Sequence, residues 1–84
     1  MKPIEFIRIK VFNQTQASFA KLAGVAQGTV SKWEAGNLAP SQEEMQRIRS
    51  AAIRSSIQWE GADWQDEWFF VTPRGASTER KVAR

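Results

Sequence analysis

The chain of 84 residues contains no cysteine and no histidine. Their absence excludes disulfides, thiolate nucleophiles and zinc sites of the usual ligand types, and it removes the commonest general base. No run of apolar residues approaches the roughly 20 that span a membrane. The start of the chain carries Lys2, Glu5, Arg8 and Lys10, so it does not have the apolar stretch of a signal peptide. We therefore expect a cytoplasmic protein that is not an enzyme and has no metal, no cofactor, no membrane contact and no small-molecule ligand.

Charge divides the chain into three parts. The composition as a whole is that of a small folded domain, with 42% hydrophobic residues, 25% charged residues and a net charge of +3. Residues 58–72 hold four acidic side chains and no basic one, whereas the segments on either side are basic. We expect a domain over residues 1–57, an acidic aromatic arm over residues 58–72 and a disordered basic tail over residues 73–84.

The N-terminal segment has the pattern of a helix. Pro3 suits the first turn of a helix, and Ile4, Ile7 and Val11 follow at helical spacing. The stretch Ile7–Val11 also alternates apolar and charged residues, as a strand does. Of the two, we favour the helix.

Two short helices are predicted next. Thr15 is a good N-cap for a helix over Gln16–Ala23, and Gly24 stands where such a helix ends in the left-handed conformation. A second helix is expected over Gln27–Ala35, ended by Gly36. The two helices are separated only by a tight corner.

A further helix is indicated by a capping box. Ser41 and Glu44 have the spacing at which each side chain bonds the other residue's backbone N–H. We expect this helix to run to about Ile57. Four apolar residues are predicted to face inward: Met45, Ile48, Ala52 and Ile53.

Small and apolar residues between Gln16 and Gly36 form a pattern typical of two helices that cross at a steep angle. Ala20 must be small for the helices to approach, and Gly24 supplies the corner. The junction is filled by three apolar residues: Val25, Val30 and Trp33. Four residues then remain on the outer face of the second helix: Gln27, Gly28, Ser31 and Lys32. Amide, hydroxyl and ammonium groups on such a face can hydrogen-bond base edges in the DNA major groove, which admits one helix.

The stretch from Thr15 to Gly36 reads TQASFAKLAGVAQGTVSKWEAG and resembles the helix-turn-helix of the Cro/C1-type (Xre family) repressors, which are lambda-repressor-like. The similarity extends more loosely over residues 4–57. It implies a mainly α fold, a compact bundle of four to five helices containing the motif. The aromatic residues that follow predict a short C-terminal arm as a β-strand or hairpin. The resemblance also implies a homodimer that binds double-stranded DNA in the major groove of a two-fold operator.

The resemblance implies roles for individual residues. The expected base-reading positions are Gln27, Gly28, Lys32 and Ser31, where Gln27 suits adenine and Lys32 suits guanine. Gly28 departs from the family, whose members often carry a base-reading side chain there. The expected phosphate contacts are Gln16, Thr29 and Asn37. The expected structural positions of the motif are Ala20, Gly24, Val25, Val30, Trp33, Glu34 and Arg8, with Arg8 and Glu34 forming an ion pair.

The arm contains five aromatic residues: Trp59, Trp64, Trp68, Phe69 and Phe70. A small domain cannot bury all of them, and exposed apolar patches usually mark interfaces, so these residues are candidates for a dimer contact. The alternatives are a strand over Glu67–Val71 that pairs with a second copy, a hairpin of that strand with Ser56–Glu60, a short helix begun at Asp63, or a lid packed over the helices. The acidic side chains Asp63, Asp66 and Glu67 are expected to form a solvated face rather than a metal site.

These observations together favour a sequence-specific transcription regulator. We expect a dimeric, Cro-like repressor of phage or bacterial type that occludes a promoter, because no sensor or protease-like domain accompanies the motif. The basic tail would add non-specific contacts to the DNA backbone. The alternative is a DNA-binding antitoxin or another protein-interaction module that uses the Trp-rich arm.

Overall fold

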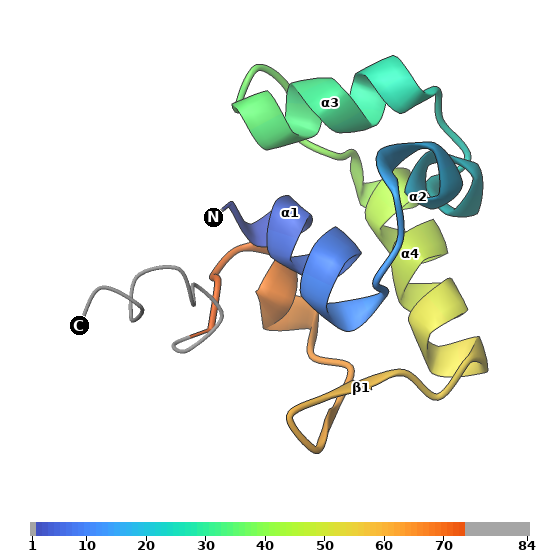
Figure 1. Ribbon diagram of the computed structural model, residues 1–84, viewed down its shortest axis with the longest axis vertical. Coiled ribbons are helices and arrows are strands. Elements are labelled where there is room, and N and C mark those ends of the chain that lie inside the picture. The colour runs from blue at the N-terminus through green and yellow to red at the C-terminus, as the bar shows by residue number, and fades with distance from the viewer. Residues whose placement is uncertain (1, 74–84) are drawn as a thin grey trace.

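The computed structural model describes residues 2–73. The helical segments are α1 Pro3–Phe6, η1 Ile7–Val11, α2 Gln16–Ala23, α3 Gln27–Ala35, α4 Gln42–Arg54 and η2 Asp66–Phe69. Figure 1 shows α2 and α3 at the upper end of α4 and the small hairpin beyond its lower end. The mainly helical fold is therefore confirmed. The basic tail expected over residues 73–84 lies, except for Pro73, outside the described residues.

The N-terminal segment is helical, so the helix prediction is confirmed and the strand alternative is wrong. In η1 the helix widens to a π-type turn, in which the Phe12 N–H donates to the Ile7 carbonyl oxygen at 2.9 Å. Asn13 ends the helix with a positive φ of 54°. The buried residues of this segment are Ile4, Phe6, Ile7, Val11 and Phe12.

The two short helices have the predicted bounds and caps. The Ser18 N–H donates to the Thr15 hydroxyl oxygen at 3.1 Å, which caps the start of α2. Gly24 ends α2 with a φ of 75°, and Gly36 ends α3 with a φ of 85°. Both values lie in the left-handed region, where glycine meets no steric penalty.

The capping box of α4 is confirmed, and the predicted inward face is confirmed in part, because Ile48 and Ala52 are buried and Met45 is half-buried whereas Ile53 is not. The Ser41 N–H donates to Glu44 at 2.8 Å and the Glu44 N–H donates to Ser41 at 3.1 Å. The helix ends at Arg54 rather than Ile57. Ile53 is 54% exposed, because the buried stripe consists of Ile48, Ala51 and Ala52, and the next residue turns about 100° away.

The arm forms a hairpin of two short strands, β1 Gln58–Trp59 and β2 Ala62–Asp63, with Gln58 opposite Asp63. The turn residues Glu60 and Gly61 have φ values of 53° and 79°, as a two-residue hairpin turn with both φ positive requires. The hairpin therefore pairs within residues 58–63 and not with residues 67–71. The strand predicted over Glu67–Val71 is wrong, since η2 occupies most of that range.

Aromatic packing explains why the end of the arm is helical. Trp68 is 4% exposed and meets the Phe6 ring edge-on at a centroid distance of 5.6 Å. Trp59 also meets the Phe6 ring edge-on, at a centroid distance of 5.0 Å. Alternation along a strand would turn Trp68 and Phe70 to the same side, whereas the tight turn of η2 buries Trp68 and leaves Phe70 69% exposed. The arm thus packs over α1, as the lid alternative describes, and its helical turn begins at Asp66 rather than Asp63.

Candidate nucleic-acid interface

The corner between α2 and α3 is held by backbone and side-chain bonds. The Val25 N–H donates to the Ala20 carbonyl oxygen at 2.9 Å, across Gly24. Arg47 of α4 donates from Nη1 to the Ala23 carbonyl oxygen at 3.3 Å. A Cβ at Gly24 would lie 3.2 Å from the Arg47 Cδ, so the arginine covers the corner closely. The α4 helix therefore takes part in fixing the angle between α2 and α3.

Beneath the corner, buried side chains hold α3 in place. Ala20, Val30 and Trp33 are at most 3% exposed, and Val25 is partly buried against the same core. The four residues expected to read bases are all exposed on α3: Gln27, Gly28, Ser31 and Lys32. A Cβ at Gly28 would meet no described atom within 4 Å. The structure thus places these four exposed residues together on one helix, with open space around Gly28.

The three residues expected at phosphates lie around this helix. Asn37 is exposed in the loop after α3, Thr29 is half-buried in its first turn, and Gln16 is half-buried at the start of α2. The α3 helix begins after Ala26, which offers no side-chain cap, and helix N-termini left in this way favour anions.

Lys2 adds a cation that the sequence did not indicate. Its Nζ lies 3.4 Å from the position of a Cβ at Gly36, beside the loop that carries Asn37. This proximity depends on how α1 sits relative to α3, and no local pattern around Lys2 could have predicted it. Lys2 and Asn37 thus lie at the same end of α3.

Arg8, Glu34 and Gln16 form a connected network at the last turn of α3. Arg8 donates from Nε to Glu34 Oε2 at 2.5 Å and from Nη2 to Oε1 at 3.0 Å. Gln16 Nε2 donates to the same Oε1 at 3.0 Å, and Arg8 Nη1 reaches the Gln14 carbonyl oxygen at 3.0 Å. The hydrogen bond to Glu34 raises the pKa of the Arg8 guanidinium above its ordinary value, although burial acts to lower it. The ion pair that the resemblance implies is therefore present, and it also holds a residue expected at a phosphate.

Two acidic side chains of the arm, Asp63 and Asp66, have protein partners. Asp66 Oδ1 accepts from Trp64 Nε1 at 2.7 Å and pairs with Arg49 Nε at 3.1 Å, while Asp63 accepts from Gln58 at 2.8 Å. Across residues 2–73, no three His, Cys, Asp or Glu side chains are grouped so that they could hold a metal ion.

Comparison with known proteins selects the same part of the chain. The family model described as Helix-turn-helix matches residues 13–52, which include α2, α3 and most of α4. This segment is a Cro/C1-type helix-turn-helix. No curated protein and no solved structure matches the chain.

The helix-turn-helix segment supports a DNA-binding transcription regulator whose partner is double-stranded DNA. The family is regulatory rather than enzymatic. Of the helices within residues 2–73, none is long and apolar enough to cross a membrane.

Proposed function

We propose that this helix-turn-helix protein binds a two-fold operator as a homodimer and represses transcription by occluding a promoter in a bacterial or phage setting. The exposed polar face of α3, set on a buried apolar frame, is the observation that carries the proposal. A rigid helix with hydrogen-bonding side chains on its free face is suited to the width of the major groove.

Gln27 and Lys32 are the residues that we propose to read bases. The Gln27 amide can bond adenine through two hydrogen bonds, and the Lys32 ammonium can donate to guanine. The side chains of Gln27 and Lys32 are both exposed. Gly28 and Lys32 are one helical turn apart, and Ser31 lies between these two residues on the same face. Each good contact of this kind discriminates against the wrong base by about 1–3 kcal/mol.

The phosphate contacts would come from both sides of α3. Gln16 lies at the start of α2, Thr29 in the first turn of α3, and Asn37 in the loop that follows α3. Contacts to phosphates fix the register of the protein on the duplex without reading its sequence. The predicted result is one orientation of α3 in each half-site.

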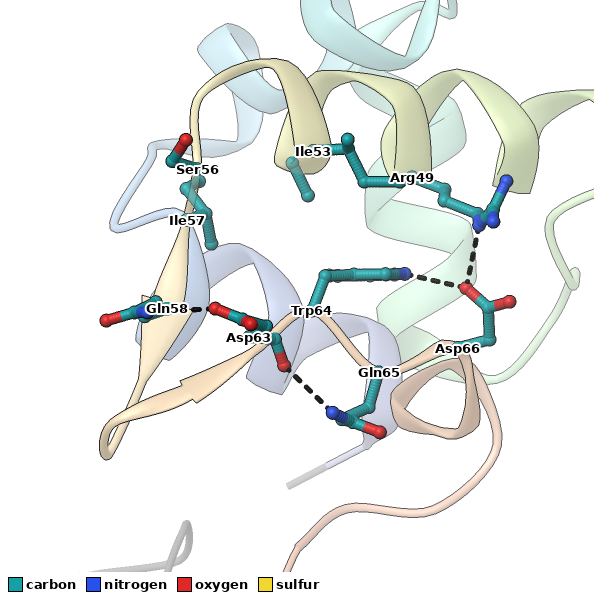
Figure 2. A pocket seen from close by; sticks show the side chains of 10 residues that line it. Arg49, Ile53, Ser56, Ile57, Gln58, Asp63, Trp64, Gln65 and Asp66 are labelled. Carbon is teal, nitrogen blue, oxygen red and sulfur yellow. Dashed lines mark hydrogen bonds and ion pairs between the residues drawn. The ribbon is translucent and has the colours of Figure 1, made fainter.

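The dimer contact is proposed for the face where α4 meets the arm. Of the five aromatic residues first considered, Trp68 is buried, Trp59, Trp64 and Phe69 are partly buried, and Phe70 is 69% exposed. Trp64 lines a hollow of about 680 Å³, and Figure 2 shows Ile53 and Arg49 on one side of it with Trp64 and Asp66 on the other. Phe70 lines a neighbouring hollow that shares Arg49 and Asp66 with the first, so an exposed aromatic side chain and a hollow lie close together, which suits a self-complementary two-fold contact.

Charge on this face supports a second copy as its occupant. The Arg49 side chain is 47% exposed and the Asp66 side chain is 63% exposed, although the two are paired. A two-fold axis near this pair would bring each Arg49 toward the partner's Asp66 and each Asp66 toward the partner's Arg49. The hollow is lined by α4 and by residues 56–66, so a contact there leaves the exposed face of α3 free for DNA.

The proposal is tested by selecting bound sequences from a random duplex library and following the affinity of the enriched duplex against salt concentration. We expect a two-fold site, whose affinity falls steeply as salt rises because phosphate contacts release counterions. The spacing of the half-sites would give the dimer geometry. Sequence-blind binding with no enriched duplex would contradict operator recognition and favour a protein partner of the acidic, Trp-rich arm.

A further inference from the structure

The side-chain amide of Gln16 is bound inside the chain before any DNA is present. Its Nε2 donates to Glu34 Oε1 at 3.0 Å, and Arg8 donates to both oxygens of the same carboxylate. The three residues come from three elements, since Gln16 opens α2, Glu34 lies in the last turn of α3 and Arg8 lies in η1. One carboxylate therefore connects the amide to the recognition helix.

This bond decides how the amide is turned. A carboxylate only accepts hydrogen bonds, so the NH₂ group of Gln16, and not its carbonyl oxygen, must face Glu34. An NH₂ group has two N–H donors, and one remains after the bond to Glu34. The chain thus holds the amide in one orientation with a donor left over.

We infer that Glu34 is a positioning residue for DNA binding, which holds the Gln16 amide so that its second N–H meets a phosphate. The inference rests on the proposed phosphate contact of Gln16. It gives Glu34 a second role beside joining η1 to α3. Because Glu34 belongs to α3, the phosphate donor is positioned relative to the helix that reads the bases.

Arg8 makes this arrangement compatible with a phosphate. An unpaired carboxylate beside the DNA backbone would repel it. The side chains of Arg8 and Glu34 are only 14% and 10% exposed, so the guanidinium offsets the carboxylate charge with little solvent between them. The Glu34 hydrogen bond also raises the pKa of Arg8, so the guanidinium stays protonated at any pH at which the protein is studied.

A double-mutant cycle separates positioning from a purely structural role. The affinity for the enriched duplex would be measured for the wild type, Gln16→Ala, Glu34→Gln and the double variant. Gln16→Ala is expected to lose about tenfold in affinity, the lower range for a hydrogen bond to a charged group. Glu34→Gln is expected to lower the affinity roughly a few-fold, because it weakens the hydrogen bond that holds the Gln16 amide without removing that amide. In the Gln16→Ala background, we expect Glu34→Gln to lower the affinity by a smaller factor than in the wild type.

The unpaired charge of Arg8 in Glu34→Gln acts equally in both backgrounds, so it cancels in the cycle. The matched control is Gln42→Ala, which removes an exposed amide from the first position of α4, the position that the half-buried Gln16 occupies in α2. The change in binding free energy caused by Gln42→Ala should add to the change caused by Glu34→Gln. If Glu34→Gln instead lowers the affinity by the same factor in the wild type and in the Gln16→Ala background, the inference is overturned.

A second readout does not require DNA. The NMR signals of the Gln16 side-chain amide should show one proton protected from exchange in the wild type, and Glu34→Gln should reduce that protection. If Glu34→Gln does not fold, Glu34→Asp keeps the charge but shortens the side chain by one methylene, and the same reduction is expected. An unprotected Gln16 amide in the wild type would overturn the inference. Failure of any duplex to enrich would instead contradict the proposed function.

Discussion

Gly28 lies exposed in the first turn of the recognition helix, in a position that does not require glycine. Its φ is not positive, and a Cβ added there would meet no described atom within 4 Å. Glycine within a helix costs about 1 kcal/mol relative to alanine. The free protein therefore carries a residue that weakens α3 without any packing reason within the described part of the chain.

We expect Gly28→Ala to raise the free energy of unfolding by about 1 kcal/mol, because the added methyl group enters open space and restricts the unfolded chain. The measurement is thermal unfolding, in which such a change raises the Tm by about 4–8 °C for a domain of this size. An unchanged or lower Tm would contradict the account of this helix. The affinity for DNA is measured in parallel. If the backbone at Gly28 approaches the DNA closely, the added methyl group lowers the affinity. If the base pair opposite Gly28 is not read, the affinity is unchanged.

Lys2 is expected to contact the DNA backbone beside Asn37. Its ammonium lies close to Gly36 at the end of α3. If Asn37 in the adjoining loop contacts the DNA backbone, the Lys2 ammonium is then also near a phosphate. Lys2→Gln should weaken binding to all duplexes alike and reduce the slope of affinity against salt by about one counterion. Arg54→Gln is the matched control, because Arg54 ends α4 at the end of the helix away from α3 (Figure 1). Equal slopes for Lys2→Gln and the wild type would show that Lys2 does not reach a phosphate.

Among the elements, those with local signals could be predicted from the sequence. The caps at Thr15 and Ser41 and the left-handed glycine at Gly24 act within a few residues, so their spacing alone gives the bounds of α2 and the start of α4. The inward face of α4 was predicted less well, since Ala51 is small enough to suit either side of a helix, whereas a large Ile53 suggests burial.

The arm and the polar network could not be predicted in the same way. The position of Trp68 depends on Phe6, at the other end of the described chain, and this contact favours a tight helical turn over a strand. The turn of the hairpin had a sequence signal in Gly61, which the pattern of aromatic residues obscured. The bond from Gln16 to Glu34 likewise needs the final angle between α2 and α3.

The packing of η2 on α1 predicts unequal effects for two aromatic residues of the arm. Trp68→Ala should lower the free energy of unfolding by about 3–5 kcal/mol, because it removes a buried indole from the core. Phe70→Ala, the matched control, should change it by no more than about 0.5 kcal/mol in the monomer, since Phe70 is 69% exposed. Urea unfolding at low protein concentration measures both, and similar values for the two variants would contradict this packing.

For the whole molecule, the proposed dimer face can be tested apart from DNA. Ile53 is 54% exposed at the hollow between α4 and the arm, and a carboxylate at this position would be desolvated in a dimer. We expect Ile53→Glu to convert the dimer to a monomer in sedimentation experiments while its affinity for a single half-site is kept. Leu38→Glu is the matched control, because Leu38 is similarly exposed, at 48%, in the loop after α3. Dissociation by both variants, or by neither, would contradict the assignment of this face.

The central claim is that the outer face of α3 reads the sequence of DNA. Its most direct test repeats the selection from a random duplex library with Lys32→Ala, and with Lys21→Ala as a control that removes an exposed lysine from α2. If α3 reads bases, Lys32→Ala relaxes the preference at one base pair in each half-site, where a guanine contact is worth about 1–3 kcal/mol, and leaves the others unchanged. Lys21→Ala then returns the wild-type site. Identical sites for the wild type and Lys32→Ala would contradict base reading by this residue, and the absence of any enriched site would contradict the claim for the helix as a whole.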